Sequence, residues 1–243
     1  MKILITGASS GLGAELARQY ATKENSLVLL ARREDKLKAL QEELTPQAKN
    51  VKIIVADVTE FEILQKKIAI LGFVDMVILN AGISIGHSEE LTSFSDFKKL
   101  YDVNVLANHA ILEILLPKFQ EQKSGKIVFI SSLASLISMP TSKAYSSSKR
   151  AVNAYAEGLR YKYNKEGIKV INILPGFIVS EMTDKNKFKM PFLLSTQEGV
   201  QKIIKAIEKN KRIYAFPFRF YIIISTLNLL PKFLREKIVN SVN

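Results

Sequence analysis

A glycine-rich segment, Thr-Gly-Ala-Ser-Ser-Gly-Leu-Gly at residues 6–13, constrains the fold of this chain more than any other feature. The apolar run Ile3-Leu4-Ile5 comes directly before it, and a helical pattern follows without a spare residue. We expect a buried strand, a tight turn at Gly7 and Gly11, and a helix that packs closely on the strand at Gly13. The first amides of such a helix are unpaired and can bind a pyrophosphate. The order of strand, turn and helix therefore favours a dinucleotide site over an ordinary turn.

Short β-branched runs alternate with helical patterns along the rest of the chain. We predict strands at residues 2–6, 26–31, 51–56, 75–80, 126–131, 168–174 and 212–216, and helices at 12–23, 35–44, 60–71, 96–121, 143–165 and 196–209. The strands are near-continuous apolar runs, as expected where helices cover both faces of a sheet. We therefore expect a single α/β domain with a doubly wound, parallel, seven-stranded sheet of the Rossmann type. Ligands of such sheets bind beyond the carboxyl ends of the strands.

The composition narrows the class of protein further. The chain has 243 residues, of which 47% are hydrophobic, enough for one well-buried core. It has no cysteine, which excludes disulfides and thiolate metal sites, and we expect no metal site of any kind. The net charge is +12, but the lysines are dispersed, so we expect solvated basic faces and no nucleic-acid partner. The N-terminus has no signal-peptide pattern, which makes a cytoplasmic protein our expectation.

Tyr145 and Lys149 form the second informative motif. They are four positions apart in a predicted helix, so their side chains share one face. A nearby cation lowers the pKa of a phenol and makes it a usable general acid or base, although an exposed helix pair is the alternative. Ser132 follows a predicted strand, where its hydroxyl can bind a substrate carbonyl or merely cap a turn. Asn104 interrupts a helical pattern, and its burial would indicate a functional or kinking role.

Taken together, these motifs resemble the short-chain dehydrogenase/reductase family, in its single-domain NAD(P)-dependent branch. The resemblance extends from Lys2 to about Ser180 and includes the last strand near residue 213. It also includes Asp57-Val58 and Asn80-Ala81-Gly82, two small polar motifs at strand ends that could otherwise simply form turns. The resemblance implies an oxidoreductase that transfers a hydride between nicotinamide and a carbonyl or alcohol.

The resemblance also implies roles for individual residues. Tyr145 would exchange a proton with the substrate oxygen, and Lys149 would lower the pKa of Tyr145 and bind the nicotinamide ribose. Ser132 would orient the substrate oxygen, and the Asn104 carbonyl would hold a water of a proton relay. Ser180 stands where the family usually has threonine, and Thr183 is an alternative equivalent. The expected cofactor-binding residues are Gly7, Ser9, Ser10, Gly11, Leu12, Gly13, Arg32, Arg33, Asp57, Val58, Asn80, Ala81, Gly82, Tyr145, Lys149, Pro175, Gly176, Ile178 and Ser180.

The end of the second predicted strand indicates which nicotinamide cofactor is used. NAD enzymes generally place a carboxylate there to bind the adenosine 2′-hydroxyl, but this chain has Ala31 followed by Arg32 and Arg33. Guanidinium groups suit a 2′-phosphate, and Ser9 could add a hydroxyl. The alternative is that both arginines only face water. We expect NADP (NADPH).

Two C-terminal segments bear on the substrate and on partners. We place a dinucleotide-binding catalytic domain at residues 1–217, with a substrate lid near 177–195, and an apolar, basic extension at 218–243. In the lid, Phe177, Met182, Phe188 and Met190 alternate with Lys185, Lys187 and Lys189. This pattern suits an apolar, acyl, steroid-like or other lipid-like carbonyl with an anionic head, unless these residues only pack the lid.

The apolar stretch of this extension, from Phe220 to Leu230, is far shorter than the roughly 20 residues needed to span a bilayer. It could pack on its own domain or on a second subunit, or lie on a membrane surface as a peripheral contact. We expect a homodimer or homotetramer that buries Leu112, Leu115, Ala151 and Tyr155 on the helices at 96–121 and 143–165. The alternatives to an NADPH-dependent reductase are a non-catalytic NADP-binding sensor and a peripheral-membrane reductase of lipid carbonyls.

Overall fold

The computed structural model describes residues 1–86, 90–184, 186 and 188–241. Its strands form one seven-stranded parallel sheet in the order β3-β2-β1-β4-β5-β6-β7. Their bounds are β1 (Lys2–Thr6), β2 (Ser26–Ala31), β3 (Asn50–Val55), β4 (Met76–Leu79), β5 (Gly125–Ile130), β6 (Ile168–Pro175) and β7 (Ile213–Phe216). The chain returns from the edge strand β3 to the centre at β4, so the winding reverses between β1 and β4. A crevice at the carboxyl ends of these two strands is the position where doubly wound sheets bind ligands.

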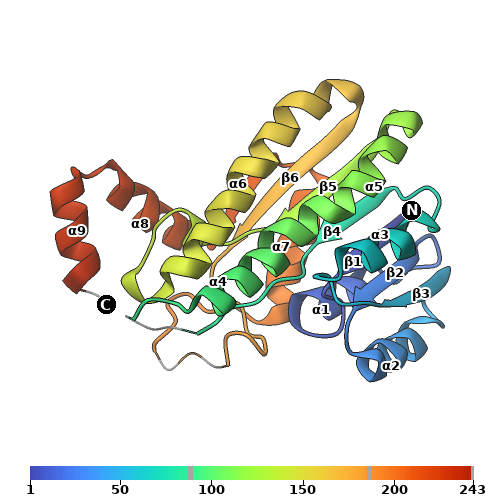
Figure 1. The fold of residues 1–243 in the computed structure, drawn as a ribbon, viewed down its shortest axis with the longest axis horizontal. Coiled ribbons are helices and arrows are strands. Elements are labelled where there is room, and N and C mark those ends of the chain that lie inside the picture. The colour runs from blue at the N-terminus through green and yellow to red at the C-terminus, as the bar shows by residue number, and fades with distance from the viewer. Residues whose placement is uncertain (87–89, 185, 187, 242–243) are drawn as a thin grey trace.

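Helices cover both faces of the sheet, which explains why its strands are apolar throughout (Figure 1). Apolar side chains of α1, α2 and α7 form the core on one face, and those of α3, α5 and α6 form the core on the other. The helices are α1 (Gly11–Tyr20), α2 (Glu34–Leu44), α3 (Phe61–Ala69), α4 (Phe94–Tyr101), α5 (Ala107–Gln122), α6 (Lys143–Tyr163), α7 (Thr196–Glu208), α8 (Phe218–Leu229) and α9 (Lys232–Ser241). The predicted Rossmann-type single domain is confirmed.

The segment predicted as one helix at 96–121 is instead interrupted. The π-helical turn η1 (Asp102–Leu106) separates α4 from α5, and Asn104 lies in the middle of this turn with 1% of its surface exposed. A buried asparagine side chain must form hydrogen bonds to avoid a large desolvation cost. Asn104 can make those bonds because the π turn redirects it away from regular helix geometry. Asn104 is therefore buried at the interruption between α4 and α5, and its role there remains a prediction.

One part of the expected subunit interface is wrong. Leu112 is 2% exposed and Leu115 is fully buried, because both face the sheet from α5 and pack in the protomer's own core. The sequence pattern marked them as apolar helix positions, but it could not say which surface they cover. Ala151 and Tyr155 on α6 do remain partly exposed, and Leu106 at the end of η1 is 47% exposed.

The extension at 218–243 folds as two helices at one end of the molecule, beyond α6 and far from β3 (Figure 1). Ile224 of α8 packs against Leu133 and Leu174, so one side of this tail belongs to the protomer's core. Phe218, Ile222 and Ile223 remain exposed on α8. No helix in the described part of the chain is long and apolar enough to cross a membrane.

Candidate active site

The turn between β1 and α1 has the geometry that its glycines require. Gly7 and Gly11 have φ values of +66° and +52°, in the region where only glycine is free of strain. A Cβ on Gly13 would overlap the Gly7 carbonyl, so strand and helix approach each other too closely for any side chain there. The Thr6 hydroxyl accepts hydrogen bonds from the backbone amides of Asn80 and Ala81, each at 2.9 Å. These bonds join the ends of β1 and β4 at the point where the sheet winding reverses.

The two adjacent arginines point to different partners. Arg33 donates to the Ser9 hydroxyl at 3.1 and 3.2 Å and to the Ser10 hydroxyl at 2.5 Å, so it lies against the glycine turn. Arg32 instead donates to the Asp57 carboxylate at 3.3 Å. Burial raises the pKa of Asp57, but hydrogen bonds from Thr59 and Arg32 outweigh it and hold that pKa below its ordinary value. Arg33 is therefore the arginine that shares a site with the serines.

The buried Asn104 side chain ties three segments together. Its Oδ1 accepts from the Ile83 amide at 2.8 Å, and its Nδ2 donates to the Ile83 carbonyl at 3.1 Å and to the Ser148 hydroxyl at 3.0 Å. Ser148 in turn donates to the Tyr145 carbonyl at 2.8 Å. The backbone carbonyl of Asn104, expected to hold a water, accepts a hydrogen bond from the side-chain Nδ2 of Asn108 at 2.8 Å. Asn104 thus positions the helix that carries Tyr145.

Ser132, Tyr145 and Lys149 come together at the carboxyl edge of the sheet. The Ser132 hydroxyl lies close enough to the Tyr145 phenol to act on its pKa, which it lowers. The Lys149 Nζ lies 5.9 Å from the centre of the Tyr145 ring and donates to the Ile130 carbonyl at 2.9 Å. A Cβ added to Gly82 would lie 3.4 Å from this Nζ, so the loop after β4 closes the other side of the group.

The pKa of Tyr145 differs from the sequence-based expectation. Burial raises the pKa of Tyr145 to about 12, and the neighbouring Ser132 hydroxyl opposes this shift only in part. Burial likewise lowers the pKa of Lys149 to about 8, because the charged form of each group loses its hydration. Desolvation is therefore the main cause of both shifts. The phenol is held in its protonated form at neutral pH.

The other predicted cofactor residues line the same edge. Asn80 Nδ2 donates to the Thr6 carbonyl at 3.0 Å, and the Ser132 hydroxyl lies 3.5 Å from the Pro175 carbonyl. Ser180 contacts the glycine turn, since its Cβ lies 3.3 Å from the position of a Cβ built on Gly11. Thr183 uses its hydroxyl within its own loop, where it accepts from the Ser180 amide at 2.8 Å. The side chains of Val58 and Ile178 are buried, and Leu12 packs against the core.

An aromatic cluster joins the lid segment, residues 177–195, to the tail. Phe220 of α8 stacks on Phe177 with ring centres 5.9 Å apart and lies 5.9 Å from Phe192, and Phe188 meets Phe177 edge-on at 5.7 Å. Gly176 lies beneath Phe220, directly after the Pro175 carbonyl that faces Ser132. Two of the lid lysines, Lys185 and Lys187, lie outside the described residues. The described part of this segment thus places apolar rings near Gly176 and Ser132.

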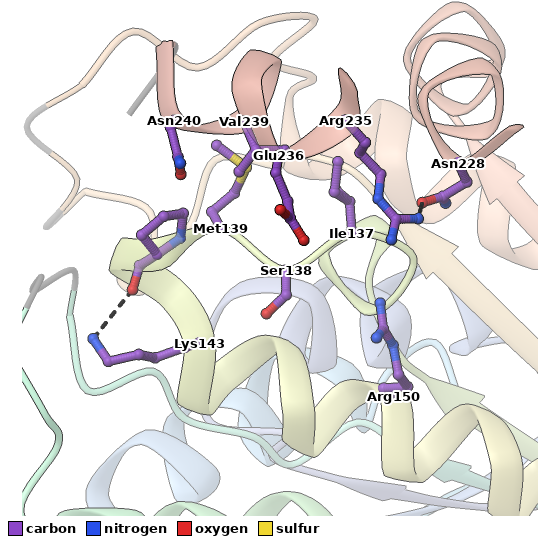
Figure 2. A pocket seen from close by; sticks show the side chains of 11 residues that line it. Ile137, Ser138, Met139, Lys143, Arg150, Asn228, Arg235, Glu236, Val239 and Asn240 are labelled. Atoms are coloured by element: carbon purple, nitrogen blue, oxygen red, sulfur yellow. Dashed lines mark hydrogen bonds between the residues drawn. The ribbon is translucent and has the colours of Figure 1, made fainter. Parts of the chain in front are cut away.

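A pocket of about 340 Å³ lies between the tail and the loop that joins Ser132 to Tyr145. Figure 2 shows Arg150 and Arg235 reaching toward it from α6 and α9, with the Glu236 carboxylate between the tail and the loop. Its lining is mostly polar, and none of the four predicted catalytic residues lines it. It is therefore distinct from the apolar surface of the lid. The residues that line it are Ile137, Ser138, Met139, Pro140, Lys143, Arg150, Asn228, Arg235, Glu236, Val239 and Asn240.

Fold and site together define a Rossmann-type nucleotide-binding oxidoreductase with a Ser-Tyr-Lys group. A model of the short chain dehydrogenase family matches residues 1–191, and the chain belongs to that family. An uncharacterized oxidoreductase of Mycobacterium tuberculosis is 38% identical over 224 residues, which cover 89% of this chain and 88% of that protein. The 11-beta-hydroxysteroid dehydrogenase-like 2 of Arabidopsis thaliana is 36% identical over 214 residues, covering 84% and 68% of the two chains.

Solved structures confirm the fold. A short-chain dehydrogenase from Sphingobium yanoikuyae in complex with NADPH superimposes with a TM-score of 0.84 at 24% identity, covering 89% of this chain and 88% of the other. A bulky-bulky ketone specific alcohol dehydrogenase from Comamonas testosteroni gives 0.82 at 21% identity, covering 95% of both chains. At these identities the likeness concerns the fold alone.

Sequence reasoning missed several residues that organise the site. Thr6 bridges two strand ends, and Asn153 accepts from the Ser131 hydroxyl at 2.7 Å and donates to Ser135, on either side of Ser132. Glu181 was not singled out at all, although it binds Arg33. Thr6 ends a strand and could have been noticed. Asn153 and Glu181 lack any local signal, because their partners are distant in sequence.

Proposed function

We propose that this protein is an NADPH-dependent reductase of a carbonyl group, or in reverse a dehydrogenase of a secondary alcohol, and that its substrate is apolar or acyl-type. The observation that carries this proposal is the Ser132 hydroxyl beside the Tyr145 phenol, with the Lys149 Nζ 5.9 Å from the centre of the Tyr145 ring. A hydroxyl pair at this place can hold a substrate oxygen and transfer a proton to it.

Tyr145 is the proton donor in the direction of reduction. Burial keeps its phenol protonated at neutral pH, so the proton is available for an oxygen that gains negative charge. Ser132 donates a second hydrogen bond that orients the same oxygen. Lys149, with a pKa lowered to about 8, stabilises the phenolate that remains and can return a proton to it.

The residues of the glycine turn fit a dinucleotide. Gly7 and Gly11 turn the backbone tightly between β1 and α1, and the first amides of a helix, which lack partners within it, suit a pyrophosphate. The nicotinamide of the bound cofactor supplies the hydride. Arg33, with Ser9 and Ser10, offers a guanidinium and two hydroxyls to a 2′-phosphate, which supports NADP over NAD.

The aromatic cluster supports the choice of an apolar substrate. Phe177 and Phe220 present stacked rings close to Gly176, and Ser132 lies against the preceding Pro175 carbonyl. A substrate whose oxygen lies between Ser132 and Tyr145 would extend its carbon skeleton along these rings.

Two further proposals concern partners. The exposed apolar residues on the outer side of α8, with Arg219 on the same helix, support peripheral contact with a membrane surface. The partly exposed α6 surface at Ala151 and Tyr155 supports a homodimer or homotetramer. A cytoplasmic location remains a prediction from the sequence.

Replacing Tyr145 with phenylalanine tests the proposed chemistry. We expect Tyr145→Phe to lose about 10²- to 10⁴-fold in turnover of a carbonyl panel graded by chain length, because general acid catalysis is removed. The variant should still bind NADPH, which a titration monitored by NADPH fluorescence would show. Tyr155→Phe is the matched control. It removes a hydroxyl from the same helix, but this hydroxyl contacts His109 and not Ser132.

Equal turnover by Tyr145→Phe and the wild type would contradict this mechanism. A wild-type protein that binds NADPH but reduces no member of the panel would favour the sensor alternative.

A further inference from the structure

The Glu181 carboxylate occupies a cationic site beside the glycine turn. Arg33 donates to its two oxygens at 2.9 and 3.2 Å, and the Lys36 Nζ donates at 2.7 Å. These bonds, led by Lys36 and Arg33, lower the pKa of Glu181 to about 2, so the side chain is an anion at any physiological pH. A loop carboxylate therefore satisfies the same groups that would bind a phosphate.

Three segments far apart in sequence build this site. Ser9 and Ser10 come from the glycine turn, Arg33 and Lys36 from the start of α2, and Glu181 from the lid. Arg33 and Glu181 are separated by 148 positions. Glu181 is the single anionic side chain among these five residues. The other four carry hydrogen-bond donors, which suit an anion from outside the chain.

The contact is readily exchanged. The side chains of Arg33, Lys36 and Glu181 are between 39% and 52% exposed, and ion pairs exposed to this extent contribute little net stability. A free ligand can therefore reach the cations, and a doubly charged phosphate competes well with one carboxylate.

Displacement of Glu181 would also affect the lid. Glu181 directly follows Ser180, which contacts Gly11, and Ile178 lies buried two residues earlier. The Glu181 carboxylate thus attaches the start of the lid to Arg33 and Lys36.

We propose that Glu181 is an internal competitor for the 2′-phosphate. It holds Arg33 and Lys36 when no 2′-phosphate is bound, and a ligand that carries this group must displace it and so release the start of the lid. The inference rests on the proposed use of NADP. It makes Glu181 a residue that sets cofactor affinity without touching the reacting atoms.

Titration calorimetry with 2′,5′-ADP and 5′-AMP tests the inference on the full chain without turnover. Glu181→Gln removes the competing charge and keeps the side-chain size, so we expect 2′,5′-ADP to bind about 3- to 30-fold more tightly. Binding of 5′-AMP should change less than about twofold, since this ligand lacks the group that competes. Glu43→Gln is the matched control. It removes the same charge from α2, where Glu43 forms an ion pair with Arg18 of α1 at 2.7 Å and not with Arg33 or Lys36.

The outcomes separate this inference from the proposed function. If the wild type prefers 2′,5′-ADP and Glu181→Gln binds it equally or more weakly, the competitor role is overturned while NADP use stands. If the wild type binds 2′,5′-ADP and 5′-AMP equally but Glu181→Gln prefers 2′,5′-ADP, the competitor role is supported. The proposed selectivity of the wild type for NADP is then contradicted. If Glu181→Gln instead weakens 5′-AMP, Glu181 binds the ribose and the inference is overturned. If Glu43→Gln gained as much affinity for 2′,5′-ADP as Glu181→Gln, the gain would come from net charge alone, and the inference would also be overturned.

Discussion

At the scale of single residues, neighbours in sequence perform different tasks. Arg32 pairs with Asp57, whereas Arg33 lies against Ser9 and Ser10. Successive residues at a strand end point in opposite directions, so a doublet of arginines does not form one cationic group.

Arg33 should contribute most to cofactor selectivity. We expect Arg33→Ala to weaken NADPH by about 10- to 100-fold relative to NADH, because a hydrogen bond to a charged group is worth about 1.5–3 kcal/mol. Arg32→Ala should weaken NADPH far less. Fluorescence titration of both cofactors measures the ratio, and Arg18→Ala controls for the loss of one positive charge. Tighter binding of NADH than NADPH by the wild type would show that Arg33 has another role.

At the scale of elements, short irregular segments carry the site. Asn104, in the π turn η1, is hydrogen-bonded to Ile83 and Ser148 and thereby connects the loop after β4 to α6, the helix that carries Tyr145. Similarly, α8 is an element added after the last strand, but Phe220 makes it part of the lid. The strands form the carboxyl edge of the sheet, and η1 and α8 supply side chains that pack around the residues at this edge.

Loss of the Phe220 ring should loosen the lid. Each aromatic pair contributes about 0.5–1.5 kcal/mol, and Phe220 makes two, so we expect Phe220→Ala to raise the KM for apolar carbonyls by on the order of tenfold. The kcat should change little, because Tyr145 and Ser132 remain in place. Steady-state kinetics over a series of chain lengths measure this effect.

Phe218→Ala is the control on the same helix, because its ring is 69% exposed and lies on the outer side. Equal KM values for Phe220→Ala and the wild type would show that the cluster only packs the lid and does not hold the substrate.

At the scale of the whole molecule, two exposed apolar surfaces need an explanation. One lies on α6 and η1 at Ala151, Tyr155 and Leu106, and the other on the outer side of α8 at Ile222 and Ile223. Contiguous exposed apolar surface generally marks a site of association. The two surfaces lie on different elements, so assembly and membrane contact can be tested separately.

We expect the wild type to be a dimer or tetramer at micromolar concentration by light scattering. Ala151→Arg should dissociate it, because a charge in an apolar interface loses its hydration without a partner. The double variant Ile222→Glu, Ile223→Glu should keep the oligomer and lose its binding to anionic liposomes.

A monomeric wild type would rule out the oligomer. If the tail variant dissociated while liposome binding stayed the same, the outer side of α8 would be an assembly surface instead of a membrane contact.

Much of this protein can be predicted from local sequence. The glycine turn, the apolar strands and the Tyr145–Lys149 spacing each depend on neighbours within a few residues, and all are confirmed as structural elements. The carboxyl edge of the sheet then brings Ser132, Asn80 and Asp57 near the turn, because parallel strands end at one edge. Periodicity and backbone sterics are short-range, so the sequence alone determined the architecture and the place of the site.

Tertiary structure decided everything that depends on which distant groups meet and how much water remains between them. It buried Leu112 and Leu115 in the protomer, raised the pKa of Tyr145 although a lysine lies nearby, and paired Glu181 with Arg33 across 148 positions. Burial and electrostatics are properties of the packed molecule, because desolvation depends on all surrounding atoms rather than on adjacent residues. The sequence thus determined which chemical groups are present, and packing determined their charge state and their partners.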